Sequence, residues 1–326
     1  MSGLLAGSRR LARRLAGRVH RGGIRRLRGA ASRLPIPQRT TDGIPTKLLA
    51  AKRLELARRR TFGPADLAAL AALLDRADAV LPLCDCLDPA RPRPGRLIGL
   101  RHDTDHDIEH SVRMAEWEAA RGYRSTYFVL HGDWYWGGPA ATGPSRFVLR
   151  ALDRIASLGH EIGLHNNAVT LALLTGEDPF RILERDLAAL RRHGFEISGS
   201  VRHGDRLCRE IGYVNSELFT ECPRPAYEPL DRPLVYQDPA SGLRRELRLR
   251  ARSMAEFGLA YEANWIGHSL YQTDTGGHWG APFDEIEGQF AEGGGFLQIL
   301  VHPVWWAMAG EPIRSRPAVS VASPGT

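Results

Sequence analysis

The chain has 326 residues, of which 43% are apolar and 25% are charged, the composition of an ordinary globular protein. Residues 1–40 hold eleven arginines and no acidic residue, whereas residues 41–326 hold 33 basic and 37 acidic ones, so the net charge of +7 comes from one end. A specific nucleic-acid-binding function is therefore not expected of the body of the chain. No apolar run reaches the length of about 20 residues that a transmembrane helix needs. No signal-peptide pattern is present either, and we expect a cytoplasmic protein.

The arginine-rich segment 1–40 has two interpretations. It is either a solvated, disordered extension or an amphipathic helix, because Leu11, Leu15 and Val19 recur at helical spacing among the arginines. A basic amphipathic helix of this kind binds anionic membrane surfaces. The inner face of a membrane is therefore one candidate partner of this segment.

Residues 41–93 are predicted to form a helical extension. The segment 46–60 is rich in Leu, Ala and Arg, and the segment 64–78 begins with Pro64 and repeats Leu at helical spacing. The prolines of 84–96 indicate a loop that separates this extension from the next domain. Two helices bury too little apolar surface to fold alone, so we expect them to pack on that domain.

Predicted strands and helices alternate over residues 94–310. The strands fall at 97–101, 126–130, 160–164, 195–201 and 296–301, and the helices at 107–121, 147–158 and 179–193. Two or three further strands are expected within 205–295, and residues 311–326 are expected to be disordered. This alternation predicts a parallel α/β domain and favours a (β/α) barrel over an open sheet. The sequence contains no P-loop and no dinucleotide-binding glycine motif.

Acidic residues and histidines follow the predicted strands at the points where the strands end. The positions are Asp103 and Asp105, His131 and Asp133, His165, Arg202 and His203, and His302. Active sites of (β/α) barrels form where the carboxyl ends of the strands converge. The pattern as a whole predicts a catalytic or metal site at that end of the domain.

Asp103 and Asp105 are two residues apart, so in extended backbone their side chains point the same way. Adjacent carboxylates predict either a bound cation or a carboxyl group with a raised pKa; the alternative is a turn with two solvated aspartates. His160 and His165 are five residues apart and face opposite ways, so at most one reaches the same ion. We choose His165 as the ligand and assign His160 to the core. A histidine with a carboxylate suits Zn²⁺ or another divalent first-row ion.

His203 and His302 each have two interpretations. His203 either belongs to the site or is a loop histidine before a flexible glycine. His302 is either an acid that titrates near neutral pH or a histidine that caps the core at the end of a strand. The nearby Trp305 and Trp306 form either a wall of the cleft or part of the core.

Four segments together resemble the polysaccharide deacetylase family, also called the NodB-homology domain or carbohydrate esterase family four. They are RHDTD at 101–105, TYFVL at 126–130, GHEIGLH at 159–165 and LVHP at 300–303. The resemblance covers about residues 95–305 and implies a distorted (β/α) barrel of the deacetylase type. It also implies that Asp103 is the general base, that Asp105 and His165 are metal ligands and that His302 is the general acid.

The chain departs from the family pattern at the second motif, where Val169 stands in place of another histidine. His203 lies near the third motif and is the candidate that replaces this ligand, and Arg202 beside it is the candidate that orients the base. The fourth motif has no clear counterpart. We expect Asp274 to line the substrate cleft together with Trp305.

The resemblance implies a metal-dependent hydrolase that removes the N-acetyl group from a sugar or glycan. A metal-bound water would attack the amide, with zinc as the expected ion and cobalt or nickel as alternatives. The expected partner is a carbohydrate or another N-acetylated small molecule, for example a cytoplasmic glycan precursor. Two alternatives remain at this point: a hydrolase of another C–N bond on the same fold, and an inactive glycan-binding pseudoenzyme.

Overall fold

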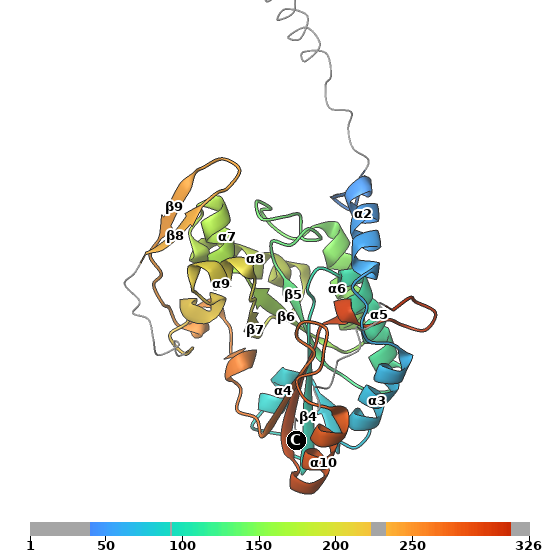
Figure 1. The fold of residues 1–326 in the computed structure, drawn as a ribbon. Coiled ribbons are helices and arrows are strands. Elements are labelled where there is room, and N and C mark those ends of the chain that lie inside the picture. Colours follow the sequence, from blue (N-terminus) through green and yellow to red (C-terminus); the bar gives the residue numbers. More distant parts are fainter. Residues whose placement is uncertain (1–39, 92, 223–232, 314–326) are drawn as a thin grey trace, which may run out of the picture. The chain divides into compact units, whose positions relative to one another are not determined.

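A curled, parallel β-sheet with helices around it forms the centre of the fold (Figure 1). The structure is a computed structural model that describes residues 40–91, 93–222 and 233–313, so nearly all of the basic tail and most of 311–326 lie outside the described residues. The sheet has eight strands in the order β10-β7-β6-β5-β4-β12-β11, with β3 pairing to β4 beside this path. The strands of the sheet are β3 (Ala79–Leu81), β4 (Arg96–Asp103), β5 (Thr126–Leu130), β6 (Glu161–Asn166), β7 (Gly199–Arg202), β10 (Tyr261–Glu262), β11 (Leu270–Thr273) and β12 (Gly295–Val301).

All pairings recorded in this sheet are parallel, so the strands end along one edge. This is the arrangement of a distorted (β/α) barrel, and it agrees with the α/β class predicted from the sequence. The barrel is open between β10 and β11. Side chains cross this opening: Gln298 donates through Nε2 to the carbonyl of Ala263 at 3.0 Å, and Arg101 donates through Nη2 to Asn264 Oδ1 at 2.9 Å.

Helices connect the strands and cover the sheet, and their ends follow local capping rules. The longer ones are α2 (Thr46–Ala57), α3 (Pro64–Leu74), α5 (Ile108–Ala119), α6 (Arg146–Ser157), α7 (Ala168–Thr175), α8 (Pro179–His193) and α10 (Phe283–Gly293). Asp178 caps α8 by accepting from two backbone amides of its first turn, and Gly194 ends it in a left-handed conformation. None of the described helices is long and apolar enough to cross a bilayer.

The short helix α4 (Leu83–Leu87) closes the amino-terminal end of the sheet. The amide of Leu83 donates to Thr126 Oγ1 at 2.8 Å, and the amide of Cys84 donates to Glu161 Oε2 at 3.1 Å. Thr126 and Glu161 are the first residues of β5 and β6. One end of the barrel is therefore filled by side chains, and a cavity is left at the other.

The segment that precedes β4 contributes to the same packed unit. The sequence predicts only helices there, but Ala79–Leu81 forms the strand β3 in the central sheet. Arg60 is buried and donates to Asp107 Oδ2 at 2.6 Å and to the carbonyl of Val304 at 2.5 Å. These bonds tie the segment to the start of α5 and to the loop after β12, beside the cavity.

Residues 205–295 hold more structure than the sequence predicts. They contain α9 (Arg206–Ile211), α10, the 3-10 helices η1 (Asn215–Leu218), η2 (Met254–Phe257) and η3 (Ala263–Trp265), the strands β10 and β11, and the antiparallel hairpin of β8 (Leu234–Gln237) and β9 (Arg244–Leu247). Helix α7 was also not predicted, because most of its residues are buried and it shows no amphipathic period. The remaining short elements are β1 (Thr40–Thr41), β2 (Ile44–Pro45) and η4 (Pro303–Trp305).

Candidate metal and catalytic site

A cavity of about 860 Å³ lies at the carboxyl ends of the strands. It gathers seven of the ten residues that the sequence points to as site candidates: Asp103, Asp105, His165, Arg202, His203, His302 and Trp305, but not His131, Asp133 or Asp274. Other lining residues were not predicted, among them Arg101, Arg209, Tyr213, Asn264 and Tyr271. The cavity has the size of a small-molecule site, with charged and apolar walls.

Alternation along β4 decides which side chains enter this cavity. Arg101 and Asp103 share one face and line the cavity, and Asp105 follows with the same parity. His102 points to the opposite face, where Nε2 lies 2.6 Å from Glu118 Oε1 on α5. The RHDTD segment therefore divides into three cavity residues and two buried residues, His102 and Thr104, that do not line the cavity.

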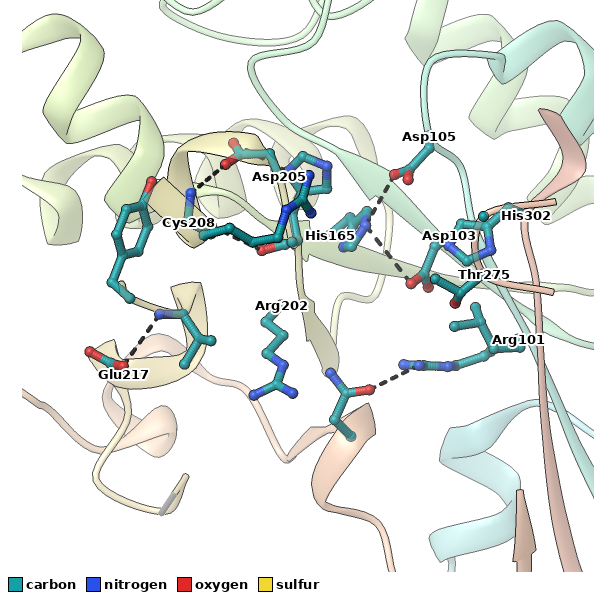
Figure 2. Close-up of a pocket in the computed structure, with 18 of the residues that line it drawn as sticks. Arg101, Asp103, Asp105, His165, Arg202, Asp205, Cys208, Glu217, Thr275 and His302 are labelled. Carbon is teal, nitrogen blue, oxygen red and sulfur yellow. Dashed lines mark hydrogen bonds and ion pairs between the residues drawn. The ribbon is translucent and has the colours of Figure 1, made fainter. Parts of the chain in front are cut away.

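Asp105, His165 and His203 come together as a three-residue group that fits a metal ion. One ligand atom from each lies within 4.8 Å of the others. Figure 2 shows Asp105 and His165 pointing toward each other. His165 Nε2 is 3.1 Å from Asp105 Oδ1 without hydrogen-bond geometry, as expected for two atoms that would share a cation. Two imidazoles and a carboxylate suit Zn²⁺ or a similar ion, which binds such ligands at about 2.0–2.2 Å. These are the three ligands chosen from the sequence.

The two histidines are held with their ligand nitrogens toward the cavity. His165 Nδ1 donates to the carbonyl of Val201 at 3.1 Å, and His203 Nδ1 donates to Asn167 Oδ1 at 3.2 Å. In each case Nε2 is left for a ligand, the usual arrangement around metal-bound histidine. Burial lowers the pKa of His203 to about 4, so this imidazole is neutral at pH 7.

The carboxylates beside His165 favour the binding of positive charge, either a proton or a metal ion. Burial is the largest single effect and raises the pKa of Asp105, but His165, His203 and His302 together hold that pKa well below its usual range. Burial likewise lowers the pKa of His165, but Asp103 and Asp105 raise it overall. Both carboxylates therefore favour the protonated form of His165, and a divalent ion at Nε2 would compete with that proton.

His131 and Asp133, which also follow a predicted strand, do not enter the metal group. His131 is fully buried, its Nδ1 donates to Asp186 Oδ2 at 2.8 Å, and its Nε2 accepts from the amide of Asn167 at 2.7 Å. Asn167 in turn accepts from His203. His131 therefore helps to position the proposed ligand His203 indirectly, through its hydrogen bond to Asn167.

Asp133 supports the loop that carries Asp105. It lies 3.2 Å from Nδ1 of His106, whose φ of +61° is in the left-handed region. The Trp134 indole donates to the carbonyl of His106 at 2.7 Å. A non-glycine residue in this conformation needs such support, and the bend it makes follows directly after Asp105.

Asp274 does not line the cleft, which corrects the sequence-based prediction. It is completely buried behind His302, and its Oδ1 lies 2.6 Å from His302 Nδ1. The same carboxylate accepts from the amide of His302 at 2.9 Å and from the indole of Trp306 at 2.7 Å. Burial lowers the pKa of His302, but Asp274, with help from Asp105 and Asp103, raises it to about 9. His302 is therefore an imidazolium at neutral pH, with Nε2 available to the cavity.

Arg202 also differs from the prediction. Within the described part of the chain its guanidinium makes no ion pair with Asp103, so it does not orient that carboxylate. The arginine whose charge acts on Asp103 is Arg101, which is buried in the cavity wall. The sequence signal for Arg101 is its spacing of two residues from Asp103, which places both side chains on the same face of β4.

Val169, at the position of the missing histidine, is fully buried in the core on α7. It offers no ligand atom, and His203 occupies the third position of the group instead. Trp305 lines the cavity and Trp306 lies in the core, so each of the two interpretations applies to one of these tryptophans.

Comparison of the chain with models of known families, with curated proteins and with solved structures gave no match.

Proposed function

We propose that the protein is a metal-dependent hydrolase that removes an N-acyl group, with an N-acetylated sugar as the substrate, by chemistry of the polysaccharide deacetylase type. The observation that carries the proposal is the presence in one cavity of a three-ligand group, a separate carboxylate and an imidazolium. Asp105, His165 and His203 would hold the ion, and Asp103 and His302 are left for proton transfer. A binding module needs no such combination of groups.

The ion, when bound, would polarise the amide carbonyl and make water easier to deprotonate. Asp103 Oδ1 has no hydrogen-bond partner among the described residues, so it can accept the proton of the attacking water. The oxygen of that water forms a bond to the carbonyl carbon. His302 gives its proton from Nε2 to the departing nitrogen as the C–N bond breaks, and the products are an amine and a carboxylate.

The charge on His302 prepares it for this role. A general acid must be protonated at the working pH, and an ordinary histidine is mostly neutral at pH 7. Asp274 supplies the compensating negative charge within the core, because it contacts both the ring and the amide of His302. Asp274 is thus a positioning residue for the acid and does not contact the substrate.

The first test is metal content per chain by elemental mass spectrometry on protein purified without chelators. We expect about one divalent ion in the wild type, and loss of that ion in His165→Ala and in His203→Ala. His193→Ala is the matched control, because His193 lies near Asp153 on the surface, away from the cavity. Retention of the ion in both ligand variants would overturn the assignment of the metal site.

The second test measures acetate and ammonia release from N-acetylglucosamine derivatives by the metal-loaded protein. Acetate release that Asp103→Asn and His302→Gln reduce by a factor of about 100 or more supports the proposed reaction. Ammonia release without acetate would instead indicate a hydrolase of another C–N bond. A protein that binds metal and sugar but releases neither product would be the glycan-binding pseudoenzyme that Val169 suggests.

A further inference from the structure

The cavity contains more positive charge than the proposed deacetylation uses. Arg101, Arg202 and Arg209 all line it, and among the described residues none of these guanidinium groups forms an ion pair with a carboxylate. Most arginines elsewhere in the described chain have such a partner, for example Arg53 with Glu109 and Arg185 with Glu177. The cavity thus gathers three arginines whose guanidinium groups have no carboxylate partner among the described residues.

Arg101 is the most deeply placed of the three. Its side chain is 1% exposed, and Nε and Nη1 have no hydrogen-bond partner among the described residues. Only Nη2 is used, in bonds to Asn264 Oδ1 at 2.9 Å and to the Tyr271 hydroxyl at 3.2 Å. A buried guanidinium that lacks partners is costly unless negative charge lies nearby. Asp103 and the buried Glu262 supply negative charge nearby, and the unused Nε and Nη1 groups are open to a ligand.

Arg202 is held on the same wall by a shared carboxylate. The buried Glu262 accepts from the backbone amide of Arg202 at 2.7 Å and from that of Asn264 at 2.8 Å. Because Asn264 also accepts from Arg101, a continuous set of bonds joins the two arginines. Figure 2 shows Arg101 and Arg202 below the group formed by Asp103, Asp105 and His165.

Arg209 is the third arginine of the cavity lining, and we call Arg101, Arg202 and Arg209 together the arginine wall. It lies on α9 among the exposed residues, one position after Cys208, and lines the same cavity. Acidic residues also line the cavity: Asp103 and Asp105 at the proposed metal group, Asp205 at the start of α9 and Glu217 on η1. An anion would be repelled by Asp103 and attracted to Arg202 and Arg209.

We propose that this arginine wall binds an anionic group on the substrate, a phosphate or a carboxylate, attached to the N-acyl sugar. The assignment rests on the proposed function and narrows its substrate to a charged sugar rather than a neutral glycan chain. Arg202 and Arg209 contact the anion, and Arg101 adds its charge from within the wall. The spacing between wall and metal group sets where the acyl group lies, which gives the anion a role in positioning the reacting amide.

The test is isothermal titration of the full, metal-free chain, because removal of the metal prevents the anion from binding there instead. The probes are N-acetylglucosamine, N-acetylglucosamine 1-phosphate, N-acetylmuramic acid and inorganic phosphate. We expect at least one charged sugar to bind about ten times more tightly than the neutral sugar, and Arg202→Gln to remove most of that difference. The charged sugar that gains affinity distinguishes phosphate from carboxylate.

Arg206→Gln is the matched control, because Arg206 lies on α9 with Glu210 as its partner and does not line the cavity. It removes the same charge from the same region and should keep the preference. Equal affinities of all three sugars for the wild type, together with no Arg202-dependent binding of inorganic phosphate, would overturn the proposal. Arg202-dependent phosphate binding without acetate release from any sugar would leave the anion site in place and reject the deacetylase function.

Discussion

His302 Nδ1 lies 2.6 Å from Asp274 Oδ1, and this carboxylate is completely buried. The pair joins the end of β12 to the residue that follows β11, two strands that run side by side. Asp274 makes the largest contribution to the raised pKa of His302, and the more distant Asp105 and Asp103 add to it. Removal of the Asp274 charge should therefore lower the proton affinity of His302 while leaving the shape of the cavity largely unchanged.

Asp274→Asn should lower the pKa of His302 from about 9 toward the ordinary value of histidine, because the negative charge beside the ring is lost. The alkaline limb of the pH–rate profile should move to lower pH by more than one unit. NMR titration of the His302 ring in metal-free protein gives the same shift without any activity. The exposed Glu285→Gln on α10 is the control, and an unchanged His302 titration in Asp274→Asn would contradict the assignment.

The same pair predicts a pH dependence of stability. A histidine whose pKa is higher in the folded than in the unfolded state contributes its full stabilisation below about pH 6.5 and loses it as the pH rises to about 9. The free energy of unfolding of metal-free protein should therefore fall over this range, by up to about 3 kcal/mol from this group. Urea unfolding of metal-free wild type and Asp274→Asn at pH 6 and pH 9.5 measures this effect. The difference in free energy of unfolding between the two proteins should be smaller at pH 9.5 than at pH 6.

Asn167→Ala should weaken metal binding by a factor of about 10 to 100, because His203 Nδ1 loses the acceptor that holds its ring. Asn167→Asp keeps an acceptor oxygen and should retain most of the affinity. Competition with a chromogenic chelator measures both variants against the wild type. Equal affinity of all three proteins would show that the bond to Asn167 does not position His203.

Gly199→Ala should lower the free energy of unfolding by about 1–3 kcal/mol, because a Cβ at this position would lie 2.2 Å from the ring of Tyr261 in the barrel interior. Tyr261 cannot easily move, since its hydroxyl donates to Glu161 Oε1 at 2.8 Å. Gly288→Ala in α10 is the control; a Cβ there meets nothing within 4 Å, and the change should be neutral or slightly stabilising. Equal stabilities in urea unfolding would contradict this packing.

Arg60→Ala should destabilise the protein by about 3–5 kcal/mol, because it leaves the buried carboxylate of Asp107 without its ionic partner. Arg53→Ala removes an arginine from the same region, but the Arg53–Glu109 pair is exposed and should contribute less than about 1 kcal/mol. Thermal unfolding of both variants measures the difference. Similar effects would mean that the segment before β4 is not anchored through Arg60.

Much of the α/β pattern was predictable because the period of side chains along a strand or helix is a local property. Thr126–Leu130 and Pro179–His193 have the predicted bounds, and the other predicted strands and helices of the barrel overlap the observed ones. Helix α7 was missed because burial on all sides removes the period. The strands β10 and β11 were not located, because they have two and four residues and too few alternating positions to identify them.

The sequence by itself identified the residues of the candidate site. Asp103 and Asp105 are two positions apart after one strand, and His165, His203 and His302 lie at or just after the ends of β6, β7 and β12, so all of them come to one edge of the sheet. Only the tertiary structure decided their partners. Asp274 meets His302 because β11 pairs with β12, His131 turns to Asp186 on α8, and Arg101, not Arg202, lies beside Asp103. The physical reason is that backbone geometry sets the direction of a side chain locally, whereas the group it meets depends on strand pairing and helix packing between distant segments.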